Sequence, residues 1–206
     1  MAIENRDNLL LIFTRNPELG KVKTRLAQGI GEANALTIYK ILLQHTHDVV
    51  VKVSGKKRIG YSVKVRENDI WESSLFEKFQ QEGEDLGQRM EHAFSEAFSD
   101  GYKKVVIIGS DLYDLQPQHL EQAFEALSTN DIVIGPAKDG GYYLLGMRLL
   151  IPEVFKNKSW GSDTVLEKTL EDVRPYSLQV LEELNDIDFA EDLEPYPEFT
   201  KYLVTN

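Results

Sequence analysis

The sequence predicts one α/β domain whose central sheet is mostly parallel and carries helices on both faces. Short apolar runs, typical of buried strands, alternate with longer segments of helical periodicity, which is the pattern of a parallel sheet with crossover helices. The length of 206 residues suits a single domain, and 42% of the residues are hydrophobic, enough for one sizeable core. No repeat, low-complexity tract or Ser/Gly-rich linker divides residues 1–206.

The predicted strands begin with residues 8–13, a continuous apolar run that stops before Arg15 and Pro17. The β-branched run at 48–53 and the alternating run at 59–65 both have strand-like patterns. We place the second of these two runs in the sheet. Later strands are predicted over residues 105–108, 131–134, 142–147 and 176–181.

Helical spacing of apolar residues begins at Glu32 and continues at least to Gln44, whereas residues 18–31 are predicted to form a loop. Asp188 fits the N-cap of a late helix, because the acidic Glu191 follows at the third helical position. Further helices are predicted over residues 86–98, 117–127 and 162–173, the last of them capped by Ser162.

The composition disfavours several classes of function. A net charge of −11 argues against a nucleic-acid partner, because neutralising phosphates needs a surplus of Lys and Arg. The absence of cysteine excludes disulfides and thiolate metal sites. The first residues lack the basic start of a signal peptide, and no apolar run approaches the ~18 residues of a membrane span. We therefore expect a cytoplasmic protein that does not act on a membrane.

A basic loop follows the first predicted strand. Its Gly20 permits close approach of the backbone to a ligand. Three cations, Lys21, Lys23 and Arg25, stand within five residues. Backbone amides, a Lys with a compact charge and an Arg with a planar, forked guanidinium together bind phosphate oxygens. The alternative is a basic loop that is simply solvated. A Walker A loop is excluded, because Arg15 stands where that motif requires its first glycine.

Two further motifs fall at the ends of predicted strands. Asp111 ends a Gly-Ser-Asp motif, where its carboxylate could bind Mg²⁺ or Mn²⁺ or simply form a turn. The pair Gly140-Gly141 favours close approach of a ligand, but Asp-Gly and Gly-Gly dipeptides equally favour a hairpin turn. Tyr142 and Tyr143 must face opposite sides of their strand. Trp160, next to Gly161, could equally pack in the core or contact a ligand.

Together these motifs resemble the bacterial GT-A-like glycosyltransferase family, a domain of unknown function in the nucleotide-diphospho-sugar transferase superfamily. That family carries a loop ending Lys-Thr-Arg-Leu, a Gly-Asp-Leu-Gly-Glu-Arg-Met segment, a Gly-Ser-Asp strand end and a Gly-Pro-Ala-x-Asp-Gly-Gly-Tyr segment. The corresponding residues here are 23–26, 84–90, 109–111 and 135–142, in the same order. The resemblance implies a GT-A/Rossmann-like three-layer α/β/α fold. One departure is Leu112-Tyr113, where relatives usually have Cys-Pro.

The resemblance also implies roles for individual residues. Asp111 and Asp186 would share a Mg²⁺ or Mn²⁺ ion. The phosphate-binding residues would be Gly20, Lys21, Lys23, Thr24 and Arg25, and the catalytic residues would include Lys23, Arg25 and Asp111. Apart from the resemblance, Asp139 is the only nearby carboxylate that we propose as a catalytic general base. Gln81 and Gly87 would lie near the nucleotide base, and the segment Asp139, Gly140, Gly141 and Tyr142 would contact the acceptor.

The resemblance leaves two reactions open. The family implies glycosyl transfer from a nucleotide sugar to an unknown acceptor, and we favour this reaction because the match spans the chain. The Thr24-Arg25 loop is also similar to the signature of guanylyltransferases and sugar-1-phosphate nucleotidyltransferases, which release pyrophosphate. A third possibility is a non-catalytic module that binds a nucleotide. Such a module would be expected to lose the loop cations or the metal-binding carboxylates, and both are present here.

Overall fold

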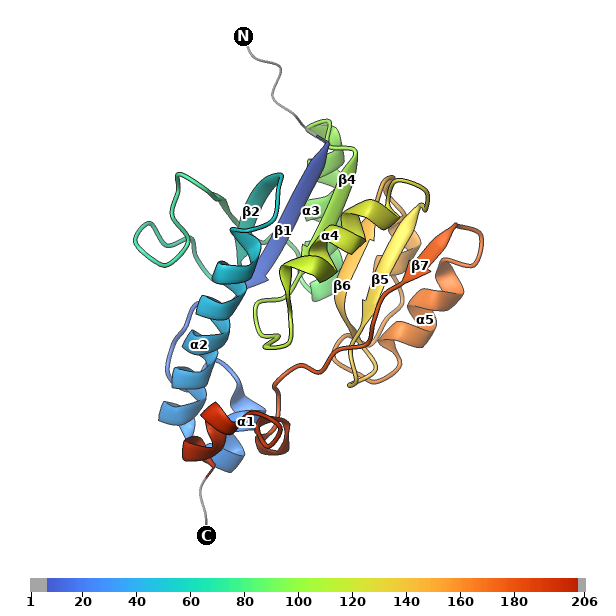
Figure 1. Cartoon of the computed structure of the whole chain (residues 1–206). Helices are drawn as coiled ribbons and strands as arrows, with labels where there is room; N and C mark the ends of the chain where they lie inside the picture. The colour runs from blue at the N-terminus through green and yellow to red at the C-terminus, as the bar shows by residue number, and fades with distance from the viewer. Residues whose placement is uncertain (1–6, 204–206) are drawn as a thin grey trace.

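The computed structural model describes residues 7–203 and contains a seven-stranded sheet in the order β3-β2-β1-β4-β6-β5-β7 (Figure 1). The strand β6 runs antiparallel to both of its neighbours, and the other pairings are parallel. This arrangement confirms the predicted mostly parallel sheet. The strands are β1 Asn8–Thr14, β2 Lys56–Tyr61, β3 Glu77–Gln80, β4 Lys104–Ile108, β5 Ile132–Pro136, β6 Tyr142–Met147 and β7 Leu178–Val180.

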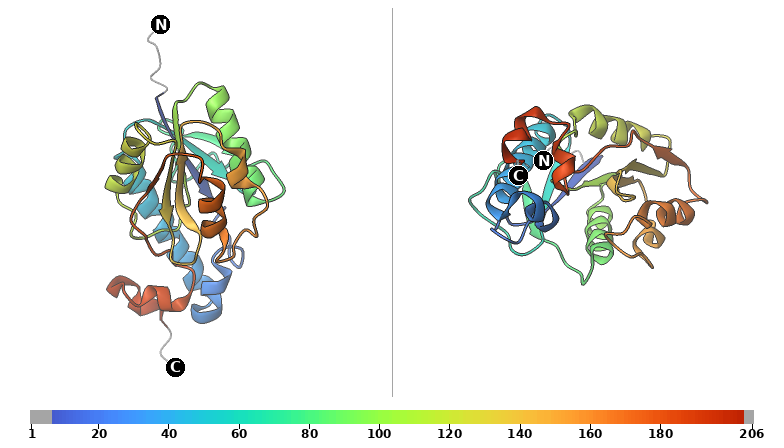
Figure 2. Two further views of the ribbon diagram at one scale, coloured as in Figure 1. Left: turned by 90° about the vertical axis from the view of Figure 1, so that its right-hand side faces the viewer. Right: turned by 90° about the horizontal axis from the view of Figure 1, so that it is seen from below.

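Helices cover both faces of the sheet, so the fold has the three layers that the sequence predicts (Figure 2). On one face the core joins β1, β2 and β4 to α2 and α4. On the other face it joins β1, β4, β5 and β6 to α3, with α5 packed alongside. The helices are α1 Thr24–Ile30, α2 Glu32–Val50, α3 Leu86–Ser99, α4 Pro117–Ala126 and α5 Val165–Asp172.

A third, smaller apolar cluster lies beyond the carboxyl end of β1. There α1 and the first half of α2 pack against the chain's last short 3-10 helices, which Figure 1 shows beside α1. These 3-10 helices are η2 Ala190–Leu193 and η3 Pro197–Tyr202, and a further one, η1 Pro152–Phe155, belongs to the core under α3. Among the described residues, no helix is both long and apolar enough to cross a membrane.

The run at 48–53 continues α2 to Val50, where buried Val49 and Val50 pack against the sheet. The second of the two strand-like runs is therefore the one in the sheet, as predicted, although its strand β2 covers Lys56–Tyr61. The structure corrects two other local predictions. The expected loop at 18–31 contains the helix α1, whose Leu26 and Ile30 are buried in the third cluster. The helix α5 begins at Val165, and no side chain caps it, because Ser162 instead bonds the hydroxyl of Thr164.

Candidate active site

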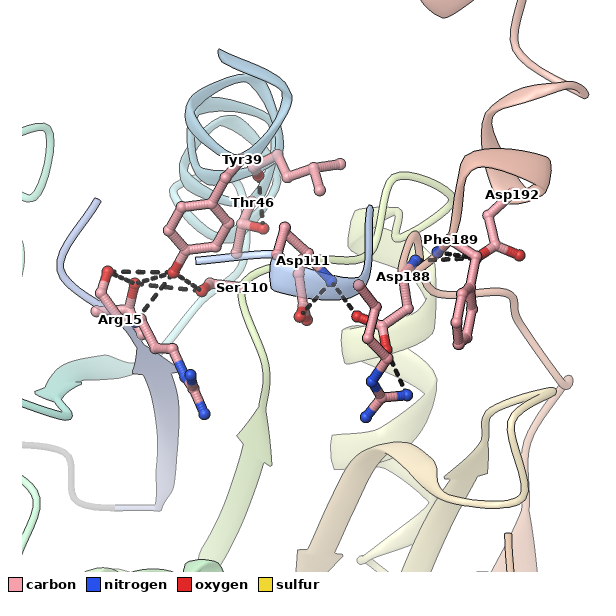
Figure 3. Close-up of polar contacts among 12 residues, drawn as sticks. Arg15, Tyr39, Thr46, Ser110, Asp111, Asp188, Phe189 and Asp192 are labelled. Carbon is pink, nitrogen blue, oxygen red and sulfur yellow. Dashed lines mark hydrogen bonds and ion pairs between the residues drawn. The ribbon is translucent and has the colours of Figure 1, made fainter. Parts of the chain in front are cut away.

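The carboxyl ends of β1 and β4 bring the first two motifs together. The two strands are parallel neighbours, so the segments that follow them leave the sheet at the same edge. Tyr39 of α2 joins these segments. Its hydroxyl accepts from the Arg15 backbone N–H at 3.0 Å, donates to the Arg15 carbonyl at 3.1 Å and lies 3.5 Å from the Ser110 hydroxyl (Figure 3). The buried tyrosine thereby holds the residue before Asp111 against the start of the basic loop.

Lys23 lies between two carboxylates at this edge. It precedes the first turn of α1 in a left-handed backbone conformation, and its side chain is only 4% exposed. The ammonium donates to Asp111 Oδ2 at 2.9 Å and to Asp188 Oδ1 at 3.4 Å, and Figure 3 shows the two carboxylates pointing toward each other. Burial opposes the charge of Lys23, but the two carboxylates outweigh burial and raise the pKa of Lys23 above its ordinary value.

The pKa of Asp111 is shifted in the opposite direction. Burial favours the neutral acid, but the charges of Lys23 and Arg15 outweigh burial and hold the pKa of Asp111 below its ordinary value. Asp111 is therefore an ionised carboxylate at neutral pH. Its side chain remains 42% exposed, so its oxygens can reach a bound ion or substrate.

Asp188 binds cations and does not cap a helix, which corrects the sequence prediction. Besides Lys23 it pairs with Arg25, whose Nη1 lies 2.8 Å from Asp188 Oδ2. The cap of η2 is provided by Asp192, which accepts from the backbone N–H groups of Asp188 at 2.9 Å and Phe189 at 2.7 Å. The Arg25 guanidinium also lies over the Phe189 ring, 5.5 Å from its centroid. Glu191 follows Ala190 in the first turn of η2 without the predicted capping role.

A cavity of about 480 Å³ opens above these residues. It carries four cationic side chains, Arg15, Lys23, Arg25 and Arg89, together with four acidic ones. The polar lining is completed by Thr24 and Gln81, whose amide donates to the Gly60 carbonyl at 2.8 Å. The larger cavity thus brings residues 23–25 of the predicted phosphate loop together with the predicted base-contacting glutamine.

A smaller cavity of about 180 Å³ adjoins the first. The two share Leu86, Gly109 and Asp111 in their walls, so Asp111 stands at the junction. The smaller cavity is also lined by Asp139 and Asp186. Its remaining lining is mainly aliphatic and aromatic and includes Leu112, Leu115, Tyr142, Tyr143, Trp160 and Val165.

The Gly-Gly motif forms the turn between β5 and β6 and also lines the smaller cavity. The Gly141 carbonyl accepts from the Ala137 N–H at 3.1 Å, and the Gly141 N–H donates to Asp139 Oδ1 at 2.8 Å. The hairpin turn is therefore confirmed, and approach of a ligand to Gly141, which lines the smaller cavity, stays a prediction. Gly140 has a φ of +84° and packs against the backbone of Asp163, outside both cavities.

Asp186 lies where negative charges accumulate. Burial first, and then the charges of Asp139 and Asp111, raise the pKa of Asp186 to about 6. Asp111 and Asp186 are oxygen donors, which Mg²⁺ and Mn²⁺ prefer, and an added cation would relieve this repulsion. Within residues 7–203 no three His, Cys, Asp or Glu side chains are grouped to hold an ion unaided. The carboxylate pair therefore fits an ion that takes its other ligands from substrate phosphates and water.

The structure places several predicted residues away from the cavities. Lys21 is exposed and pairs with Glu18 at 2.9 Å, and Gly20 packs against the Glu32 carboxylate. Gly87 lines neither cavity, because it is packed against the Phe155 backbone and the Trp160 ring. Its missing side chain makes room for the indole that walls the smaller cavity.

Sequence reasoning missed Arg15, Arg89 and Tyr39. Arg15 and Arg89 line the larger cavity. In the sequence each is marked only by its position, since Arg15 follows β1 and Arg89 lies inside the 84–90 motif. Tyr39 has the periodicity of a core residue and gives no separate signal. Only the fold shows that its hydroxyl reaches the strand ends.

Known protein structures share the fold of this chain. The crystal structure of a proposed nucleotide-diphospho-sugar transferase from Desulfovibrio desulfuricans G20 is 33% identical, with a TM-score of 0.85, and the match covers 94% of this chain and 87% of that one. Among curated protein sequences, none matches the chain significantly.

Two more distant structures share the fold. A 4-diphosphocytidyl-2C-methyl-D-erythritol synthase from Anaerococcus prevotii DSM 20548 has a TM-score of 0.60 at 11% identity, covering 96% of this chain and all of that one. A manganese complex of Rv0371C from Mycobacterium tuberculosis H37Rv has a TM-score of 0.58 at 12% identity, covering 96% and 98%. A family model described as an uncharacterised protein conserved in bacteria (DUF2064) matches residues 37–162. The chain belongs to this DUF2064 family.

Proposed function

We propose that the protein is a metal-dependent glycosyltransferase that moves a sugar from a nucleotide-diphospho-sugar to an acceptor. The supporting observation is the pair of adjoining cavities that meet at Asp111. Every cationic side chain that lines either cavity belongs to the larger one, which suits a diphosphate. The smaller cavity then receives the acceptor. The similarity to the Desulfovibrio protein, across most of both chains, agrees with this assignment.

The chain's own residues supply most of the chemistry. Lys23 and Arg25 bind phosphate oxygens. The half-exposed Arg25 exchanges its partner Asp188 for the substrate, whereas the buried Lys23 keeps its carboxylate partners. Arg15 and Arg89 add positive charge to the same cavity. Asp139 lies at the acceptor side and takes the proton of the attacking hydroxyl.

Asp111 and Asp186 would hold Mg²⁺ or Mn²⁺. A bound ion supplies electrostatic stabilisation of the charge that develops on the departing diphosphate. Lys23 already provides one fixed positive charge next to Asp111, at 2.9 Å. The buried, preorganised ammonium needs little rearrangement to act on the same charge.

Nucleotidyl transfer is the second candidate, and the number of cations favours it. Four cationic side chains exceed what a diphosphate requires and would suit a triphosphate that expels pyrophosphate. The two reactions differ in the leaving group, so a product assay separates them.

The test incubates the protein and Mg²⁺ with a panel of nucleotide sugars and, separately, of nucleoside triphosphates with phosphorylated sugars. We expect nucleoside diphosphate from a sugar donor, and a rate lower by about 10² or more in Asp111→Asn. The matched control is Asp163→Asn, an exposed aspartate outside both cavities. Release of pyrophosphate alone would establish nucleotidyl transfer instead. Release of neither, from protein that still binds nucleotide, would show a binding module.

A further inference from the structure

The chemical character of the acceptor can be inferred from the smaller cavity, and this inference rests on the proposed function. Among its described lining residues there are three carboxylates, Asp111, Asp139 and Asp186, and no Lys, Arg or His. The four cations of the site all line the other cavity. The two adjoining cavities therefore differ in the charge of their lining, and so in the ligands that suit them.

An anionic acceptor does not suit this cavity. Sites that bind phosphate or carboxylate groups place Arg, Lys or converging backbone amides around the anion. Here an anion would lie beside the carboxylates of Asp139 and Asp186. The Lys23 ammonium that pairs with Asp111 lines only the larger cavity. Even a partly solvated pair of like charges is repulsive at such short range.

The rest of the lining is apolar or aromatic. Leu112, Leu115 and Val165 are buried, and the Trp160 ring forms part of the wall. A cavity of about 180 Å³ has room for a group about as large as one ring. Burying an apolar group there removes its surface from water, which stabilises binding without any charge.

Tyr142 adds a polar requirement. Its hydroxyl is buried and forms no hydrogen bond within the described part of the chain. Burial raises the pKa of Tyr142, so the group remains a neutral hydroxyl at physiological pH. Buried hydroxyls nearly always have a partner, and a neutral oxygen brought beside this one by a bound ligand would supply it.

We propose that the acceptor is an uncharged alcohol with an apolar or aromatic body, bound in the cavity between Asp139, Tyr142 and Trp160. In the transfer, the acceptor oxygen forms a bond to the anomeric carbon of the sugar. The bond from that carbon to the diphosphate oxygen breaks, and its electron pair leaves with the nucleoside diphosphate. The proton of the alcohol passes to the carboxylate of Asp139. A phosphorylated acceptor is disfavoured, because Asp139 repels it and no cationic side chain among the described residues lines this cavity.

The test measures binding to the full chain, without donor and with a chelator present, of three probes with the same body: benzyl alcohol, benzylamine and benzyl phosphate. Ligand-observed NMR titration detects such weak binding. We expect benzyl alcohol to bind at least about tenfold more tightly than benzyl phosphate. In Asp139→Asn/Asp186→Asn this ratio should fall below about threefold, because the repelling charges are gone. Trp160→Ala should weaken the binding of all three probes, and an unchanged far-UV circular dichroism spectrum would show that the variant is folded.

Several results would overturn the assignment. Equal or tighter binding of benzyl phosphate to the unmodified protein would do so, as would no detectable binding of benzyl alcohol. A ratio that the double asparagine variant leaves unchanged would show that the carboxylates do not select the ligand. Benzylamine binding more than tenfold tighter than benzyl alcohol would identify a cationic acceptor. None of these measurements involves a nucleotide sugar, so a failed acceptor assignment and a failed glycosyl transfer are observed separately.

Discussion

Asp186 is a half-buried carboxyl group beside two other carboxylates, and its pKa of about 6 compares with an ordinary value of 3.8. Because the folded-state pKa is the higher one, the folded protein holds this proton more tightly than the unfolded chain. Asp186 therefore costs stability as the pH rises from about 4 through about 6. Below that window the group is neutral in both states and costs nothing.

We predict that Asp186→Asn removes this cost. The free energy of unfolding of the variant, relative to the unmodified protein, should rise by roughly 1–2 kcal/mol between pH 4 and pH 7, after allowance for solvent screening. Urea unfolding in the presence of a chelator measures the difference at each pH. A difference that does not change with pH would show that Asp186 is not perturbed.

At the scale of an element, the β5–β6 hairpin offers a matched pair of glycines. At Gly140 the φ of +84° is a left-handed conformation, and a Cβ would run into the backbone of Asp163. At Gly141 a Cβ would meet only the Asp139 carboxylate, at 3.1 Å. The first glycine is therefore needed for the backbone, and the second lies beside a residue of the proposed acceptor site.

We predict that Gly140→Ala loses about 1–3 kcal/mol of stability and that Gly141→Ala loses less than 1 kcal/mol. Gly141→Ala should instead weaken benzyl alcohol binding, because the added methyl displaces Asp139. Thermal unfolding and the NMR titration together separate the two effects. Equal stability of the two variants would contradict the described turn.

The elements themselves were largely predictable from hydrophobic periodicity. The strand at Tyr142–Met147 was predicted with its observed bounds, and the helix at Leu86–Ser99 within one residue. The run at 48–53 has a strand-like pattern because β-branched residues are locally typical of strands. In the folded protein Val49 and Val50 gain more by packing on the sheet as the end of α2. The strand β3 has only four residues, none of them fully buried, so it has no apolar signature.

At the scale of the whole molecule, the third apolar cluster fixes the late aspartates against the basic loop. Ile187, between Asp186 and Asp188, is fully buried in this cluster with Leu26 of α1 and Phe199 of η3. Phe199 is 1% exposed, and its ring centroid lies 4.8 Å from that of Tyr113. The end of the described chain thus helps to position two carboxylates of the site.

We predict that Phe199→Ala lowers the free energy of unfolding by about 3 kcal/mol and weakens Mg²⁺-dependent binding of a nucleoside diphosphate. The control is Phe98→Ala, in α3, whose partly buried ring packs against the core on the other face of the sheet. That variant should lose stability without a change in nucleotide affinity. Calorimetric titration below both melting temperatures gives the comparison, and equal affinities of the two variants would contradict the positioning role.

The sequence by itself determined the fold class, the order of most elements and the motifs that follow the strands. These features depend on residues close together in the chain, whose spacing is visible in one dimension. The tertiary structure decided which charges meet. Lys23 binds Asp111, 88 residues away, and Asp188, 165 residues away, whereas Lys21 turns outward to Glu18. It also decided that Gly87 makes room for Trp160 and that Asp188 pairs with cations. Such pairings follow from the directions in which packed elements point their side chains, and no local pattern encodes those directions.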